Sequence, residues 1–169
     1  MGNMRRVLAV VGSVVFLVVA PGFVAGLVPW WISRRGTDTL NLGLPLRGAG
    51  LILMICGASL LIDSFARFAL QGLGTPAPVF PTRHLVVTGL YRYVRNPMYV
   101  AVVSVIFGES LWWGNVGVFE YGCFIWLAFH LFVLLYEEPT LRGSYGGEYE
   151  AFCANVRRWI PRLRPWIAP

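Results

Sequence analysis

The polar groups best suited to bind a ligand gather between residues 82 and 99, in a stretch with apolar sequence on both sides. Arg92 and Arg95 bring positive charge to it. Asn96 followed by Pro97 predicts the start of a helix, because Asn caps helix N-termini and Pro is favoured at the first helical position. A helix N-terminus offers free N–H groups and a partial positive charge. The stretch therefore predicts a cationic pocket that can hold a carboxylate or a phosphate.

Three ionisable residues are candidates for catalysis, namely Arg95, Glu109 and His130. Glu109 and His130 lie inside apolar runs, where an ionisable side chain suggests a function. Each also has a structural interpretation: Glu109 can bond a neighbouring helix, His130 can be a buried and satisfied residue, and Arg95 can be a charge at a span boundary. The residues alone leave the catalytic group unassigned.

The composition indicates an integral membrane protein. The 169 residues are 57% hydrophobic and 13% charged, with a mean hydropathy of +0.64, whereas a soluble domain has about 25% charged residues. The three Cys have no metal-type spacing, so we expect no metal, and they read as small buried apolar residues. Membrane lipids, and not nucleic acid, are the expected partners.

Four apolar runs predict an all-α membrane protein with about four transmembrane helices. They cover about residues 7–28, 46–66, 97–113 and 116–136. Because a run of about 20 apolar residues can cross a bilayer, residues 1–70 should hold two spans. The turn at Gly114-Asn115 should join the last two runs as an antiparallel hairpin. We expect one domain over residues 1–169, with its binding core in 71–169.

Three boundaries follow from local signals. Residues 29–46 should form the first loop, and Pro139 should end the fourth helix just after Glu137 and Glu138. Residues 148–158 should form an amphipathic C-terminal helix, because apolar side chains recur there at spacings of three and four. The basic, tryptophan-rich sequence that follows suits an anionic membrane surface.

The arginines predict the orientation in the membrane. With four spans, segments 1–6, 67–96 and 137–169 lie on one side and hold eleven arginines, against three on the other. Basic residues favour the cytoplasmic side, so both termini should be cytoplasmic. The stretch 82–99, Glu137 and the C-terminal segment would then share one face.

Several motifs, taken together, carry a family resemblance. G-L-Y-R-Y-V-R-N-P-M-Y, a helical hairpin, E-E-P-T-L, Y-G-G-E-Y-E-A-F and V-R-R-W-I-P-R follow one another in this order. The chain resembles the isoprenylcysteine carboxyl methyltransferase superfamily, which includes membrane phospholipid methyltransferases, in a bacterial-type form. The resemblance covers about residues 71–164 and, more loosely, the first two spans.

The resemblance implies an integral membrane methyltransferase that uses S-adenosylmethionine. The cofactor would lie in a cytoplasm-facing pocket closed by the C-terminal segment, and a lipophilic substrate would enter from the bilayer, which is the inner membrane in a bacterium. The implied cofactor-binding residues are Arg83, Leu85, Val86, Tyr91, Asn96, Pro97, Met98, Tyr99 and Glu137.

The resemblance also suggests roles for these residues. Asn96 and Tyr99, at the helix start, would hold the methionyl carboxylate with help from Arg95. Glu137 would accept from the methionyl ammonium or the ribose, while Tyr91 and Tyr99 would pack against the adenine or the sulfonium. Glu138 could be only a solvated neighbour.

Two departures from the family pattern concern the substrate. Many members carry His where this chain has Asn96, and the eukaryotic prenylcysteine enzymes bind substrate with an Arg four residues before the cofactor Glu, where this chain has Val133. A prenylcysteine carboxylate is therefore a doubtful acceptor. A neutral or differently charged lipid, or a small hydrophobic molecule, fits better.

Two other classes stay open. One is an NADPH-dependent membrane reductase of the sterol-reductase type, which shares a similar hairpin and an Arg-x-Pro-x-Tyr-like motif. The sequence E-E-P-T-L-R-G-S-Y-G-G-E-Y fits the methyltransferases better. The other is a non-enzymatic four-span protein, which would bind no cofactor.

Overall fold

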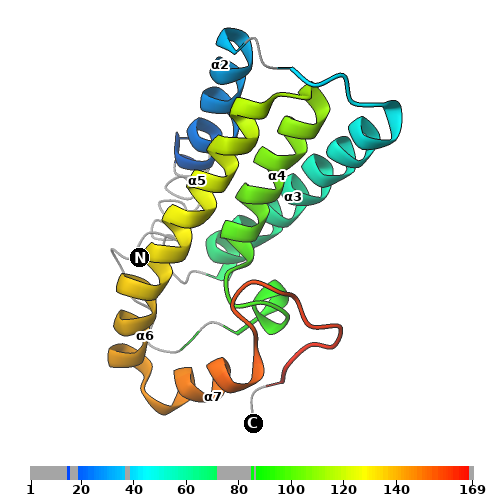
Figure 1. The fold of residues 1–169 in the computed structure, drawn as a ribbon. Coiled ribbons are helices and arrows are strands. Elements are labelled where there is room, and N and C mark those ends of the chain that lie inside the picture. The colour runs from blue at the N-terminus through cyan, green and yellow to red at the C-terminus, as the bar shows by residue number, and fades with distance from the viewer. Residues whose placement is uncertain (1–14, 16–18, 37–38, 72–84, 86, 168–169) are drawn as a thin grey trace.

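The computed structural model of the protein describes residues 15, 19–36, 39–71, 85 and 87–167, and only the backbone of residues 67–71. Within these residues the regular structure is helical, which confirms the all-α fold. The elements, with η for π or 3₁₀ turns, are η1 (Phe23–Leu27), α2 (Val28–Arg35), α3 (Leu44–Gln71), η2 (Gly89–Arg92), α4 (Pro97–Trp113), α5 (Val116–Phe132), η3 (Val133–Glu137), α6 (Glu138–Tyr145) and α7 (Gly147–Asn155). Figure 1 shows α4 between α3 and α5, with α7 running across the lower end of this bundle.

Two described stretches are long and apolar enough to cross a membrane. They are Leu44–Ala66 in α3 and Val116–Tyr145, which runs from α5 through α6. Helix α4 is also apolar but has only 17 residues. Half of the first predicted run, 7–28, lies outside the described residues, so the count of four spans stays a prediction.

Helix α4 and the start of α5 have the predicted bounds. Helix α4 begins at Pro97 and ends at Trp113, and Gly114 follows it with a φ of 66°, a left-handed conformation that favours glycine. Asn115 then caps α5, because its side chain accepts a hydrogen bond from the backbone N–H of Val118 at 2.9 Å.

Helices α3 and α4 approach closely through small residues. A Cβ added to Gly50 would lie 2.7 Å from the carbonyl oxygen of Gly108, and one added to Gly57 would lie 2.8 Å from that of Ala101. Both pairs are spaced by seven residues, so they lie about two turns apart on antiparallel helices. Small residues let helices pack tightly in membranes, where packing rather than the hydrophobic effect holds helices together.

The helix of α5 continues past Pro139, so the prediction that Pro139 ends it is wrong. The π turn η3 comes directly before α6, and Pro139 sits in the first turn of α6. A proline cannot donate to the carbonyl four residues earlier and clashes with it in a regular helix. That carbonyl belongs to Leu135, inside η3, where the wider turn makes room for the ring.

A related arrangement occurs nearer the N-terminus, where the chain also kinks at Ala25, whose φ of −108° and ψ of 18° are not helical. The π turn η1 precedes Pro29 by two residues, as η3 precedes Pro139. Helix α2 then continues to Arg35, so the predicted loop over 29–46 is wrong for residues 29–35, and α3 begins at Leu44 rather than at residue 46. Cys56 and Cys123, expected to be buried, are exposed on α3 and α5.

The C-terminal helix α7 is shorter than the predicted 148–158, because it ends at Asn155. Its buried side chains are Tyr149 and Phe152, and with Val156 they form a second apolar cluster beneath the bundle. Residues 156–167, which we call the tail, then run back along the segment that precedes α4. The backbone N–H of Arg95 donates to the carbonyl of Arg157 at 3.0 Å.

Candidate functional site

Tyr99 joins the start of α4 to the end of η3. Its hydroxyl donates a hydrogen bond to Glu137 Oε2 at 2.8 Å. Tyr99 is the third residue of α4, and Glu137 is the last residue of η3. The two predicted binding residues, which lie 38 positions apart in the sequence, are therefore neighbours in the structure.

Tyr91 brings a second phenol to the same carboxylate. It belongs to η2, the 3₁₀ turn before α4. Burial, and in addition the negative charge of Glu137, raises the pKa of Tyr91 above its ordinary value. Tyr91, Tyr99 and Glu137 thus converge from three elements, and their role in binding stays a prediction.

Asn96 stands at the N-terminus of α4 as predicted, but its side chain does not cap the helix. Its Nδ2 instead donates to the carbonyl of Arg158 in the tail at 3.2 Å. The first turn of α4 is thus left without a side-chain cap. Because Pro97 has no N–H, the backbone donors at this end are those of Met98 and Tyr99.

The other predicted binding residues lie elsewhere or outside the description. Met98 packs its side chain into the apolar core between the helices. Leu85 packs against the cluster around α7. Arg83 and Val86 lie outside the described residues.

Glu138 is the centre of a buried ionic network that the sequence analysis missed. Glu138 is only 3% exposed to solvent. Arg158 forms a forked pair with it, from Nε at 2.6 Å and Nη2 at 3.0 Å. Arg95 Nη1 lies 3.2 Å from Oε1, and Arg142 lies 3.9 Å from Oε2. The prediction that Glu138 is a solvated neighbour is wrong.

This network occupies Arg95. Besides Glu138, its Nη1 donates to Cys153 Sγ on α7 at 2.6 Å. Its Nε is buried and makes no hydrogen bond with the described residues. Arg95 therefore ties the segment before α4 to α6 and α7, and its role as a ligand-binding or catalytic residue stays a prediction.

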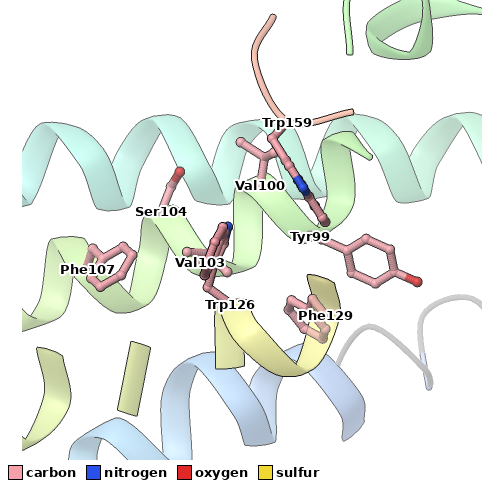
Figure 2. A pocket seen from close by; sticks show the side chains of 8 residues that line it. All are labelled: Tyr99, Val100, Val103, Ser104, Phe107, Trp126, Phe129 and Trp159. Carbon is pink, nitrogen blue, oxygen red and sulfur yellow. The ribbon is translucent and has the colours of Figure 1, made fainter. Parts of the chain in front are cut away.

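An aromatic pocket of about 240 Å³ lies beside Tyr99. Figure 2 shows its lining, which comes from α4, α5 and the tail: Tyr99, Val100, Val103, Ser104, Phe107, Trp126, Phe129 and Trp159. The Tyr99 ring lines the pocket and contacts Phe129 with centroids 4.7 Å apart, while its hydroxyl points out of the pocket. Tyr99 thus separates an apolar space from the carboxylate of Glu137.

His130 stands at the edge of this pocket and holds the tail there. Its Nδ1 accepts a hydrogen bond from Trp159 Nε1 at 3.0 Å. The His130 ring stacks on Trp126 with centroids 5.3 Å apart. Since Nδ1 accepts, the bonded imidazole is neutral with its proton on Nε2. This contact favours the structural interpretation of His130.

The three candidate catalytic residues are not brought together. Arg95 lies in the network around Glu138, and His130 lies at the pocket edge. Glu109 lies thirteen residues along α4 from Asn96, or about 20 Å at 1.5 Å per residue. It is 7% exposed, and its Oε2 has no hydrogen-bond partner among the described residues.

The sequence assigns no role to two residues of this region, Glu138 and Trp159, because its local patterns give only weak indications of their contacts. Glu138 precedes Arg142 by four residues, a spacing that predicts a helical ion pair, yet its main partner lies twenty residues away in the tail. Trp159 belongs to the motif V-R-R-W-I-P-R, but only the fold shows that this residue reaches α5. Both cases depend on how the tail folds back, which no local pattern encodes.

Comparison with known proteins identifies the family. Residues 46–148 match the family model described as phospholipid methyltransferase. No curated protein and no solved structure matches the chain. The matched region is more than half of the chain and includes Tyr91, Tyr99 and Glu137. The two long apolar helices among the described residues agree with a membrane protein, and the chain belongs to the phospholipid methyltransferase family.

Proposed function

We propose that the protein is an S-adenosylmethionine-dependent methyltransferase acting on a lipophilic acceptor at the cytoplasmic face of a membrane. The observation that carries the proposal is the hydrogen bond between Tyr99 and Glu137. It sets a carboxylate beside two tyrosines at the uncapped start of α4. The family membership supports the reaction class.

The residues at this place fit the proposed cofactor. S-adenosylmethionine carries a cationic ammonium and sulfonium, for which Glu137 supplies negative charge and Tyr91 and Tyr99 supply aromatic rings. It also carries a carboxylate, for which the first turn of α4 offers the N–H groups of Met98 and Tyr99. When bound, the cofactor supplies an electrophilic methyl group.

The aromatic pocket is the proposed place of the acceptor. Its volume of about 240 Å³ is below the roughly 300–1,000 Å³ of sites for drug-sized ligands. One chain or one ring system therefore fits, rather than a whole two-chain lipid. The Tyr99 ring would orient this group, and Trp159 with Phe129 would exclude water from it.

The charges around the pocket argue against an anionic acceptor. None of its described lining residues carries a positive charge. The nearby Arg95 and Arg158 are paired to Glu138. Val133, which replaces the substrate arginine of the prenylcysteine enzymes, is 1% exposed and buried in η3. An uncharged or cationic acceptor fits these surroundings.

The test is cofactor binding by the purified protein in detergent or nanodiscs. Isothermal titration calorimetry should show binding of S-adenosylmethionine and of its demethylated product. A rise of the melting temperature with either, and none with NADPH, separates the methyltransferase from the reductase. Folded protein that binds neither methyl-transfer ligand would contradict the proposal, and stabilisation by NADPH alone would favour the reductase.

A further inference from the structure

The tail exposes apolar side chains at regular intervals. Ile160 is 61% exposed, Leu163 is 101% exposed and Ile167 is 73% exposed. They recur at spacings of three and four within eight residues. Single exposed apolar residues are ordinary on protein surfaces, so the argument depends on what holds these three and what surrounds them.

The tail backbone is fixed to the segment before α4. The N–H of Arg162 donates to the carbonyl of Tyr93 at 2.9 Å, and the N–H of Trp166 donates to that of Arg92, also at 2.9 Å. Arg92 returns a bond from Nε to the carbonyl of Trp166 at 2.8 Å. Leu163 lies between these attachment points, so its exposure is imposed by the fold.

These attachments also set the level of the tail in the molecule. Residues 92–95, to which the tail is bonded, lie two to five positions before Pro97, where the apolar helix α4 begins. The tail therefore lies at the height at which an apolar helix leaves the aqueous surface. Figure 1 shows it below the lower end of α4, and Trp159 near its start also reaches α5.

Positive charge alternates with the apolar side chains. Arg157 and Arg164 are exposed, and residues 156–167 contain no Asp or Glu. A second copy of the chain would bring the same charges to the contact and be repelled. A surface that is apolar and anionic at once matches both features, and the headgroup region of a bilayer with anionic lipids is such a surface.

We propose that the tail is a second membrane contact of the protein, separate from its spans. Ile160, Leu163 and Ile167 enter the interfacial layer of the bilayer, while Arg157 and Arg164 contact anionic lipid headgroups. The contact is independent of the methyl-transfer reaction, so either proposal can fail without the other.

Fluorescence of the full chain in nanodiscs tests this contact. Dansylalanine would replace Leu163 in one sample and the exposed Glu148 of α7 in a control. Nanodiscs would contain phosphatidylcholine alone or an equimolar mixture with phosphatidylglycerol, each with lipids brominated on the acyl chains. We expect quenching at position 163 and little at 148, with quenching at 163 increased about twofold by phosphatidylglycerol.

A charge-matched pair of variants tests the arginines. Arg157→Gln with Arg164→Gln should abolish the response of position 163 to phosphatidylglycerol. Arg34→Gln with Arg35→Gln, at the far end of α2, should leave that response unchanged. A probe at 163 that is not quenched by lipid would overturn the proposal, whether it stays in water or is shielded by a second copy in the same nanodisc. Quenching at position 163 that is the same with and without phosphatidylglycerol would overturn the proposed contact with anionic headgroups.

Discussion

Glu137 and Glu138 are adjacent in sequence and have different partners. Glu137 accepts from the Tyr99 hydroxyl beside the aromatic pocket, while Glu138 neutralises arginines from three segments. Successive helical residues point about 100° apart, so the two carboxylates face different parts of the molecule. One faces the proposed cofactor site, and the other holds segments of the fold together.

Substitution of Glu137 should affect the ligand more than the fold. Glu137→Gln keeps the shape and removes the charge, and a charge-assisted hydrogen bond contributes about 1.5–3 kcal/mol. We expect S-adenosylmethionine to bind roughly 10- to 150-fold more weakly, since about 1.4 kcal/mol is a factor of ten. Calorimetry measures the Kd, and a thermal melt of the same variant should change little. An unchanged Kd would make Glu137 a structural partner of Tyr99 only.

Substitution of Glu138 should affect the fold itself. Glu138→Gln leaves Arg95 and Arg158 without their counter-charge, and breaking a buried ion pair costs roughly 3–5 kcal/mol. The matched control is Glu150→Gln, which removes an exposed pair with Arg142 and should change the stability little, because solvent screens that pair. Chemical unfolding in mixed micelles measures both. Equal losses would mean that the network contributes no more than a surface pair.

The sequence could predict the position of Glu137 at the end of the fourth run but not the contacts of Glu138. The motif that contains both is local, and it points to a carboxylate at the end of the fourth run. The partner that distinguishes Glu138, Arg158, comes from a tail that turns back after α7. The fold of the tail also explains why the sequence did not show that Trp159 lines the pocket. It likewise explains why Asn96 does not cap α4, since its side chain donates to the tail instead.

At the scale of elements, the bounds of α4 were predictable because strong local signals flank it. Asn96-Pro97 opens the helix, and Gly114-Asn115 closes it and caps the next. The ends of α2 and α6 were not. At η3 a π turn lets the helix continue past a proline that predicts a stop, and at η1 the chain kinks at Ala25 and resumes as α2, which contains Pro29. A local stop signal therefore holds only when no wider turn precedes it.

The contact between α3 and α4 should be sensitive to a single methyl group. Gly57→Ala places a Cβ 2.8 Å from the carbonyl oxygen of Ala101, and such overpacking costs roughly 1–3 kcal/mol. Gly48→Ala is the control on the same helix, where an added Cβ meets nothing within 4 Å. We expect Gly48→Ala to leave the stability unchanged or to raise it by up to about 1 kcal/mol, because Ala has a higher helix propensity than Gly. Thermal melts compare the two, and equal melting temperatures would mean that the helices separate freely.

At the scale of the whole molecule, the site gathers at one end of the bundle. Tyr91, Tyr99 and Glu137 lie where α4 begins, and the tail and α7 lie there too (Figure 1). The distribution of arginines places this end in the cytoplasm, as a prediction from the sequence. A cytoplasmic cofactor would then reach the site without crossing the membrane.

Cysteine accessibility measures this orientation. Single cysteines at positions 3, 38, 78 and 160, in intact cells treated with an impermeant thiol reagent, should differ in one respect. Only position 38 should react from outside, because four spans leave the other three in the cytoplasm. Reaction at position 78 from outside would separate the stretch 82–99 from the cytoplasmic face and contradict the proposed arrangement.

The π turn η3 also bears on how the chain tolerates changes in length. A π turn holds one residue more than the α turn it replaces. The helices on either side therefore present nearly the same faces to their neighbours as they would without the extra residue. Removing Leu135 alone would leave Pro139 to clash with an ordinary helical turn, and the helix would kink above Glu138. Removing Leu135 together with Pro139→Ala would instead yield an unbroken α-helix with both carboxylates still turned to their partners. The extra residue and the proline are thus a matched pair, so a homologue that has lost one is expected to have lost the other.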